Sequence, residues 1–296
     1  MVSKPLVILS DIHANLSALE IVYDSIDLPR DQYEIFFLGD LTGYGPTVFQ
    51  VYNKIKKLNP EIWLAGNHDK ALQEESICFS NMNPTAKECI KIHRRNLESN
   101  IRTELSNKPE KTINGHYLCS HGFPITGDSS IETYDFEFSP EKKSDQILAL
   151  WKEHYEKTNI WFVGHSHSQK FWWYDAGGEG WTLFPSKEER YNEKKLTVLK
   201  SSAGSKRSIK FSLKKSEIKK DLFIINPGSV GFPRKSYFEN LNGHQYANYM
   251  ILREVDDQME FEFITCAYSA DMVLSLWNAS HYPSDLQKQL QGVKNV

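Results

Sequence analysis

The sequence predicts a layered α/β domain, and three features of the chain point to it. Short apolar runs recur along the chain, as in LVIL at 6–9 and EIWLA at 61–65. Each run is followed by glycine or a polar group, and segments with helical periodicity lie between the runs. Runs of this kind are typical of strands that are buried on both faces and covered by helices. Their alternation with helices favours stacked layers.

Five of the apolar runs end in side chains that can bind a metal or transfer a proton. These ends are Asp11 with His13, Asp40, Asn67 to Asp69, His121, and His165 with His167. Ligands of α/β sheets lie at the carboxyl ends of the strands, so we expect these side chains to converge at one edge. One residue separates Asp11 from His13, and an extended backbone would point both side chains the same way.

Helical segments separate the strands. They are expected at 16–26, after the N-cap residue Asn15, at 46–58, at 84–98 and at 139–157. Asparagine is a favoured N-cap, and the first segment repeats apolar residues on one face. Proline at the start of the second and third segments fits the first turn of a helix.

The part of the chain from about 175 to 220 differs from the rest in composition. It is rich in glycine, serine and lysine, with strand-like pieces at 195–199 and 209–213. We interpret it as a polar β-rich insertion that projects from the core, built from two hairpins. Apolar runs at 246–255 and 259–268 then predict an antiparallel pair. The expected organisation is one domain, residues 1–296, with an insertion at about 175–220.

Composition excludes several classes of protein. The 296 residues carry a formal net charge of -3, so there is no basic field typical of nucleic-acid binding. No apolar segment approaches the ~20 residues that a membrane helix needs. The four cysteines show no CxxC spacing, which is typical of a reduced protein. We therefore predict a cytoplasmic protein.

The polar strand ends predict a transition-metal site. A single GD after a strand is usually a turn, and a single histidine is usually an ordinary hydrogen-bonded group. GNHD at 66–69 is more specific, because a turn requires only the glycine and the asparagine. Five such ends in one chain favour a shared site. Mixed nitrogen and oxygen ligands suit zinc, manganese or iron better than calcium.

The motifs DxH, GD, GNHD, a single histidine and GHxH resemble the calcineurin-like metallophosphoesterase superfamily. The resemblance covers roughly residues 4–171 and 221–266. GDLTGYGP at 39–46 and NPGSVGFPR at 226–234 resemble its bacterial and archaeal branch of small phosphoesterases. The resemblance implies a four-layer αββα sandwich with a dinuclear metal site. It also implies hydrolysis of a small phosphomonoester or phosphodiester, with nucleotides among the candidate substrates.

The resemblance also implies a role for each residue. One metal ion would be bound by Asp11, His13 and His167, and the other by Asn67, His121 and His165, with Asp40 bridging both. The two divalent transition-metal ions (Mn, Fe or Zn) would share a hydroxide that attacks phosphorus in line. His68 would be the catalytic residue that stabilises the phosphoryl group and protonates the leaving oxygen.

Three further residues are candidates around this site. Arg234 offers a fork of donors for a substrate phosphate, although a surface ion pair is an equal alternative. Tyr44 is a candidate for the pocket mouth, although packing explains it equally well. The segment LTGYG at 41–45 lacks the aspartate and arginine that protein phosphatases and symmetrical dinucleoside-tetraphosphate hydrolases place there. His68 thus lacks its usual carboxylate partner, and Asp69 is the remaining substitute.

One alternative function belongs to a different class. A member of the same superfamily serves the retromer complex through protein contacts, so the alternative function is a catalytically weak metal-binding scaffold. Scaffold members tend to lose the catalytic histidine, whereas this chain has His68. The enzyme is therefore the favoured interpretation. The sequence leaves monoesterase and diesterase activity, the native metal and the oligomeric state open.

Overall fold

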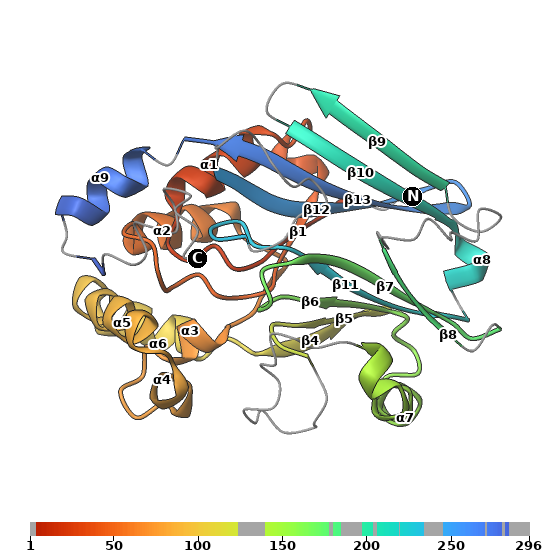
Figure 1. The fold of residues 1–296 in the computed structure, drawn as a ribbon, viewed down its shortest axis with the longest axis horizontal. Coiled ribbons are helices and arrows are strands. Elements are labelled where there is room, and N and C mark those ends of the chain that lie inside the picture. Colours follow the sequence, from red (N-terminus) through yellow and green to blue (C-terminus); the bar gives the residue numbers. More distant parts are fainter. Residues whose placement is uncertain are drawn as a thin grey trace, which may run out of the picture.

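Two β-sheets stacked face to face form the centre of the molecule (Figure 1). The structure, a computed structural model, describes residues 4–123, 140–177, 180–184, 197–203, 206–218, 220–233, 245–269, 271–279 and 282–283. The candidate Arg234 lies outside the described residues.

The first sheet has the strand order β3-β2-β1-β12-β13-β10-β9. Its strands are β1 (Leu6–Leu9), β2 (Glu34–Phe37), β3 (Ile62–Trp63), β9 (Thr197–Ala203), β10 (Lys206–Lys214), β12 (Gln245–Val255) and β13 (Gln258–Tyr268). β1, β2 and β3 run parallel, and the other neighbours pair antiparallel. The antiparallel pair expected at 246–268 is thus confirmed as β12 and β13.

The second sheet has the strand order β4-β5-β6-β11-β7-β8. Its strands are β4 (Lys111–Asn114), β5 (Tyr117–Ser120), β6 (Ile160–Val163), β7 (Gln169–Asp175), β8 (Gly180–Phe184) and β11 (Leu222–Pro227). β5, β6 and β11 run parallel. Each sheet therefore has three neighbouring parallel strands, and their carboxyl ends lie at one edge.

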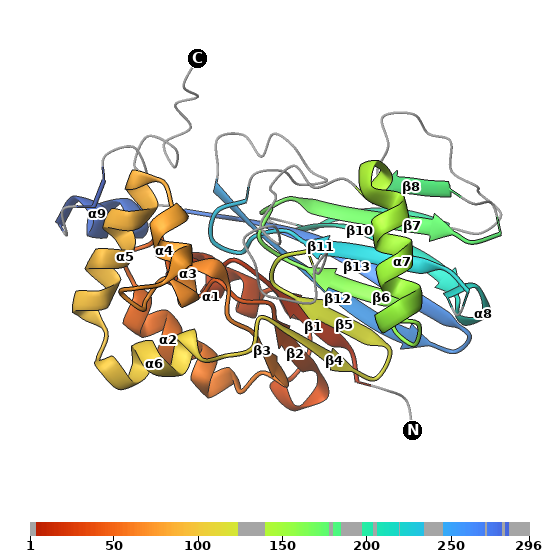
Figure 2. The same cartoon turned by 90° about the horizontal axis from the view of Figure 1, so that it is seen from below.

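Helices cover the outer faces of both sheets. α1 (Leu16–Asp24) and α2 (Val48–Leu58) pack on the first sheet, and α7 (Ser144–His154) packs on the second (Figure 2). Asn15 caps α1 by accepting a hydrogen bond from the Ala18 amide, as predicted. The remaining helices are α3 (Asn67–Lys70), α4 (Ile77–Asn81), α5 (Pro84–Asn96), α6 (Ser99–Ser106), α8 (Lys215–Ile218) and α9 (Asp271–Ala279). Short 3-10 helices span Arg30–Gln32 and Pro140–Lys143.

Three apolar layers hold these elements together. Between the sheets, Phe36, Phe162 and Phe211 belong to one buried cluster. A second cluster joins α1 and α2 to the first sheet, and a third joins α7 to the second. The order helix, sheet, sheet, helix is the predicted four-layer αββα sandwich. Apolar runs buried on both faces follow directly from it, because strands such as β1 and β6 contact the other sheet on one side and helices on the other.

The described strands between 175 and 220 do not project from the core, so that expectation is wrong. β8 extends the second sheet, and the β9–β10 hairpin extends the first. Ile209, Phe211 and Leu213 of β10 are buried between the sheets, while the intervening residues face outward. Alternation of this kind buries one face of a strand. Removing this part would therefore strip strands from both sheets.

Among the described residues, no helix is long and apolar enough to cross a bilayer. The four cysteines are free thiols.

Candidate metal centre

The predicted ligands lie in loops at one edge of the two sheets. The loops after β1, β2 and β3 come from the first sheet, and those after β5, β6 and β11 come from the second. Backbone hydrogen bonds join the loops: the His13 amide donates to the Asp40 carbonyl, and the Gly231 amide donates to the Asp11 carbonyl. Parallel strands thus deliver their carboxyl ends to a common site, as predicted.

The backbone is left-handed at five of the seven predicted ligands, so the expectation of an extended backbone at Asp11 and His13 is wrong. Asp11 and His13 have φ angles of 55° and 48°, and Asp40, His165 and His167 also have positive φ. Such conformations cost free energy in residues other than glycine and occur where the surrounding structure holds them. The side chains converge because the loops turn sharply after each strand ends.

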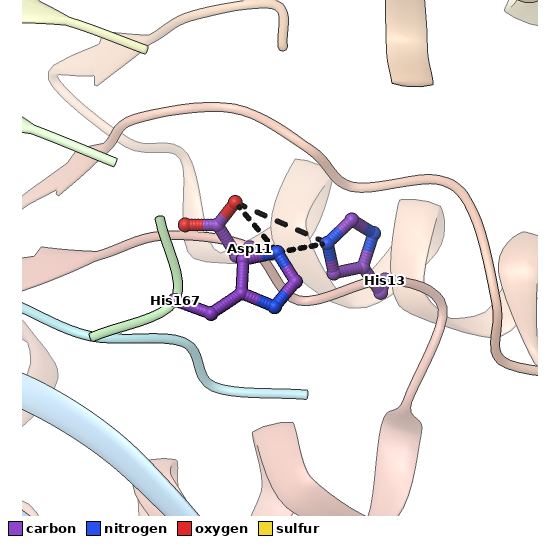
Figure 3. Close-up of side chains that lie close together, drawn as sticks. All are labelled: Asp11, His13 and His167. Carbon is purple, nitrogen blue, oxygen red and sulfur yellow. Dashed lines mark hydrogen bonds and ion pairs between the residues drawn. The ribbon is translucent and has the colours of Figure 1, made fainter. Parts of the chain in front are cut away.

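Asp11, His13 and His167 meet in a fully buried group (Figure 3). The His13 Nε2 atom lies 2.9 Å from the His167 Nε2 atom. The Asp11 Oδ1 atom is 3.4 Å from the His167 nitrogen and 3.9 Å from the His13 nitrogen. One carboxylate oxygen and two imidazole nitrogens therefore face a common point.

A second group forms around Asp40. Its Oδ2 atom lies 3.3 Å from the His121 Nε2 atom and 3.7 Å from the His13 Nε2 atom. The Asn67 Oδ1 atom lies 3.0 Å from the His165 Nδ1 atom and 3.3 Å from the His121 Nε2 atom. Asp40 is therefore the residue that faces both groups, between His13 on one side and His121 on the other.

Backbone carbonyls fix the orientation of three histidines. The Nδ1 atoms of His13, His121 and His167 lie 2.7, 2.8 and 2.8 Å from the carbonyls of Thr42, Leu38 and Phe232. A carbonyl only accepts, so each Nδ1 atom carries a proton and donates it. In the neutral ring this leaves the lone pair on Nε2, directed at the site. Such partners commonly set the tautomer of a metal-binding histidine.

The donor set fits divalent cations. Neutral His13 and His167 would place two lone pairs 2.9 Å apart, an arrangement that repels unless a positive charge lies between them. The Asp11 Oδ1 atom is buried and has no hydrogen-bond partner among the described residues. Buried polar atoms are normally paired, so an unpaired carboxylate oxygen beside two imidazoles indicates a place for a cation.

Burial and neighbouring charges shift the pKa values of the predicted ligands. Burial and the attraction of Asp40 act in opposite directions on His121, and the net effect raises its pKa to about 9. Burial lowers the pKa of His165 to about 3 and holds that of His13 well below its usual range. Burial disfavours the charged Asp40, but the neighbouring histidines, His121 foremost, together lower the pKa of that carboxyl well below its usual range. The buried carboxylates therefore require positive charge nearby.

His68 lies beside these groups at the start of α3. Its backbone amide donates to the Asp40 Oδ1 atom at 2.9 Å, and the residue is 5% exposed. The ring centroid is 4.8 Å from that of His13 and 4.9 Å from that of Tyr44. Tyr44 is half-buried and also contacts the ring of Phe232.

Asp69 does not take the role of a carboxylate partner for His68. Its carboxylate accepts hydrogen bonds from the amides of Leu41, Thr42 and Gly66 and from the Thr42 hydroxyl. The His68 Nδ1 atom is buried without a partner among the described residues. Asp69 instead joins the loop after β2 to the loop after β3, and burial raises its pKa to about 6. The suggestion that it substitutes as the partner of His68 is thus wrong.

The NPGSVG segment joins the two sheets at the site. The Asn226 side-chain amide donates to the Gly164 carbonyl at 2.6 Å, and the Ser229 hydroxyl donates to the Asp11 carbonyl at 2.8 Å. Gly164 immediately precedes His165, so each bond fixes a loop that carries predicted ligands. The motif could be recognised in the sequence, whereas these contacts could not.

His93 is a site neighbour that the sequence did not reveal. It is fully buried on α5 and forms hydrogen bonds to the backbone of Gly43 and Gly45. It matches no motif, and nothing in its local sequence distinguishes it from an ordinary core histidine.

A four-layer αββα sandwich with buried aspartate and histidine groups at its strand ends defines the class of protein. A family model described as calcineurin-like phosphoesterase matches residues 4–195, and the chain belongs to that family. The family implies divalent metal ions and phosphoester chemistry.

Two known proteins are similar to this chain over most of its length. An uncharacterized protein of Methanocaldococcus jannaschii is 27% identical over 265 residues, which cover 88% of this chain and 87% of that protein. The crystal structure of a metallophosphoesterase from Sphaerobacter thermophilus aligns with a TM-score of 0.66 at 24% identity. The alignment covers 97% of this chain and 98% of that chain, and it supports the fold.

Proposed function

We propose that this protein is a dinuclear metal-dependent phosphoesterase that hydrolyses a small phosphomonoester or phosphodiester. The observation that carries the proposal is the position of Asp40, whose Oδ2 atom lies 3.3 Å from one imidazole and 3.7 Å from another in two different groups. One buried carboxylate between two sets of ligand atoms suits a pair of cations, because its charge offsets their repulsion.

The ligands divide into two sets. Asp11, His13 and His167 would hold one cation, and Asn67, His121 and His165 the other. When bound, two divalent ions (Mn, Fe or Zn) supply an activated water nucleophile and offset the charge of the phosphate oxygens. The carbonyls that fix the histidine tautomers keep the Nε2 lone pairs of His13, His121 and His167 available for those ions.

His68 would act on the phosphoryl group and the leaving oxygen. Its ring adjoins His13, its amide donates to Asp40, and a ring nitrogen lies within 4.8 Å of ligand atoms of both, so it lies within the ligand cluster. An imidazole at this position can donate a hydrogen bond to a bound ester, and its protonated form can transfer a proton to the leaving oxygen.

Tyr44 would contact the organic part of the substrate. Its ring lies beside His68 and against Phe232, and both aromatic rings are half-buried. A nucleoside is one organic group that could pack on such rings. The proposed location remains cytoplasmic, and Arg234 remains a candidate phosphate contact.

The test has two parts. Elemental analysis of protein reconstituted with manganese is expected to find two metal ions per chain. A panel of phosphomonoesters and phosphodiesters assayed with the same protein is expected to reveal metal-dependent hydrolysis. A stoichiometry that stays at one at high manganese would contradict the dinuclear centre. Two bound ions with no turnover on the whole panel would contradict the enzymatic proposal and favour a binding role.

A further inference from the structure

The ring of His68 is positioned by the backbone of a neighbouring loop. A Cβ atom added to Gly43 would lie 2.2 Å from the His68 Nδ1 atom and 3.0 Å from the His13 Nδ1 atom. The backbone of Gly43 therefore lies directly against the Nδ1 atom of His68. Because that nitrogen has no hydrogen-bond partner among the described residues, packing and not a carboxylate fixes the ring.

That loop, residues 43–45, adopts a strained conformation. Gly43 has a φ of 94° and Tyr44 a φ of 53°. The second value is unfavourable for a residue with a side chain, so contacts from elsewhere must hold the loop in place. The Gly45 amide lies 2.7 Å from the Gly43 carbonyl and 2.9 Å from the His13 carbonyl, which ties the turn to the loop after β1.

Two residues from distant helices hold the outer side of this loop. The Gly43 amide donates to the His93 Nδ1 atom at 3.1 Å, and the His93 Nε2 atom donates to the Gly45 carbonyl at 2.8 Å. The Trp277 Nε1 atom of α9 donates to the Tyr44 carbonyl at 3.0 Å. His93 and Trp277 are both fully buried.

The hydrogen bonds of His93 define the tautomer of its ring. Accepting at Nδ1 and donating at Nε2 requires one neutral tautomer, so both ring nitrogens are committed to the loop. Few side chains present an acceptor and a donor with this spacing. A core position that needed only volume would accept leucine or phenylalanine equally well. The two hydrogen bonds therefore indicate that His93 is needed to set the geometry of the loop and not only to fill the core.

We propose that His93 is a positioning residue for the phosphoesterase reaction, which acts by holding residues 43–45 against the ring of His68. The inference rests on the proposed function, because it assigns His93 a role through the predicted catalytic residue. His93 itself reaches the loop backbone and not the ligand cluster. Trp277 supports the same loop through a single bond.

The decisive experiment is a double-mutant cycle between His93 and His68. The variants are His93→Leu, His68→Gln and the double substitution, assayed on p-nitrophenyl phosphate and ribose 5-phosphate. If the protein proves to hydrolyse phosphodiesters, the two substrates are instead bis(p-nitrophenyl) phosphate and a dinucleotide. Small misplacements of a catalytic group can cost up to ~10²-fold. We expect His93→Leu to lower kcat/KM about 10-fold or more in the native background and less than about 2-fold beside His68→Gln.

Three controls separate positioning from loss of stability. His93→Gln keeps one acceptor and one donor and is expected to recover most of the loss. Ile90→Val removes a methylene from a fully buried residue of the same helix without altering the loop bonds, and it is expected to show no coupling to His68. Metal content is measured in every variant and should remain that of the native protein. If His93→Leu fails to fold, Trp277→Phe, which removes the Nε1 donor together with part of the buried ring, replaces it in the cycle.

The outcomes are distinguishable. Equal fractional losses from His93→Leu in both backgrounds would overturn the positioning role and leave His93 as a core residue. The positioning role would also be overturned if His93→Gln lost as much activity as His93→Leu while the melting temperature of His93→Gln stayed native. If the native protein hydrolyses no ester, the proposed function fails. If it hydrolyses esters and His68→Gln is impaired but uncoupled to His93, only the present inference fails.

Discussion

The loops of the candidate metal centre and the β9–β10 edge of the first sheet differ in how far their charged side chains are buried. At the metal centre, Asp11 and Asp40 are buried and have left-handed backbones. Along β10, charged side chains pair across the sheet at the surface, as between Lys210 and Glu260, whose side chains are 28% and 20% exposed. One region carries charge where water cannot reach it, and the other leaves charge in contact with water.

The difference indicates which region depends on a ligand. Burying a carboxylate is costly unless it is paired, so the metal-site loops are stabilised only when positive charge is present among them. Exposed ion pairs contribute little, because water already solvates both partners. Substitutions in the first region should therefore abolish function, and comparable substitutions in the second should have small effects.

Replacing Asp40 tests the largest expected effect. Asp40→Asn keeps the shape of the side chain but removes the charge that would offset two cations. We expect a loss on the order of 10³-fold in kcat/KM, the scale of losing a group that stabilises charge in the transition state. Elemental analysis is expected to show loss of both metals. Asn67→Ala, which alters one ligand set, is the control and should do less harm. Two bound metals and near-native turnover in Asp40→Asn would refute the bridging role.

Replacing His68 should have an effect that depends on the leaving group. An alkoxide needs a proton as it departs, and general acid catalysis is typically worth ~10²–10⁴-fold, whereas a nitrophenolate leaves with little help. His68→Gln is therefore expected to lose far more activity on an alkyl ester than on an aryl ester of matched charge. The comparison of kcat/KM on the two esters measures this. Equal fractional losses would leave His68 as an electrostatic clamp.

His93 predicts a pH dependence of stability. Burial lowers its pKa from 6.5 to about 4 in the folded protein. The folded state therefore disfavours the protonated ring, so this contribution is complete above pH 6.5 and is lost as the pH falls toward 4. The loss amounts to roughly 3 kcal/mol of unfolding free energy. Urea unfolding of the native protein and His93→Gln between pH 7 and 4.5 measures the difference in slope. Parallel curves for the two proteins would show that His93 does not titrate in this range.

The smallest effect is expected at the β10 edge. Lys210→Ala removes an ion pair with Glu260 whose N–O distance is 3.0 Å. Such pairs contribute up to about 1 kcal/mol, and salt screens them further. We expect a small change in unfolding free energy and native kcat/KM. A loss of activity would show that the edge strands communicate with the metal centre and that the contrast between the two regions is too simple.

The sequence predicted the layers and the converging residues because both depend on local patterns. An apolar run that ends in Asp11 or His121 predicts both a strand and the position of its carboxyl end. The pairing of β10 with β13 could not be predicted, because the alternation of Ile209, Phe211 and Leu213 indicates a buried face but not its partner. The left-handed backbones also escaped prediction, since an aspartate after a strand looks the same whether the chain stays extended or turns. His93 escaped because its role depends on a loop 48 residues away.

The strand order of the first sheet has a consequence for synthesis on the ribosome. β12 lies between β1 and β13, so β1 pairs with a strand that is synthesised much later than itself. About 240 residues separate Ile8 from its partner Met250, a delay on the order of ten to fifty seconds at typical translation rates. During that interval one edge of β1 stays unpaired. The seven predicted ligands all precede residue 168, so they are synthesised before β12. The loop that carries Asp11 and His13 therefore gains the second neighbour of its strand only after every ligand has been made.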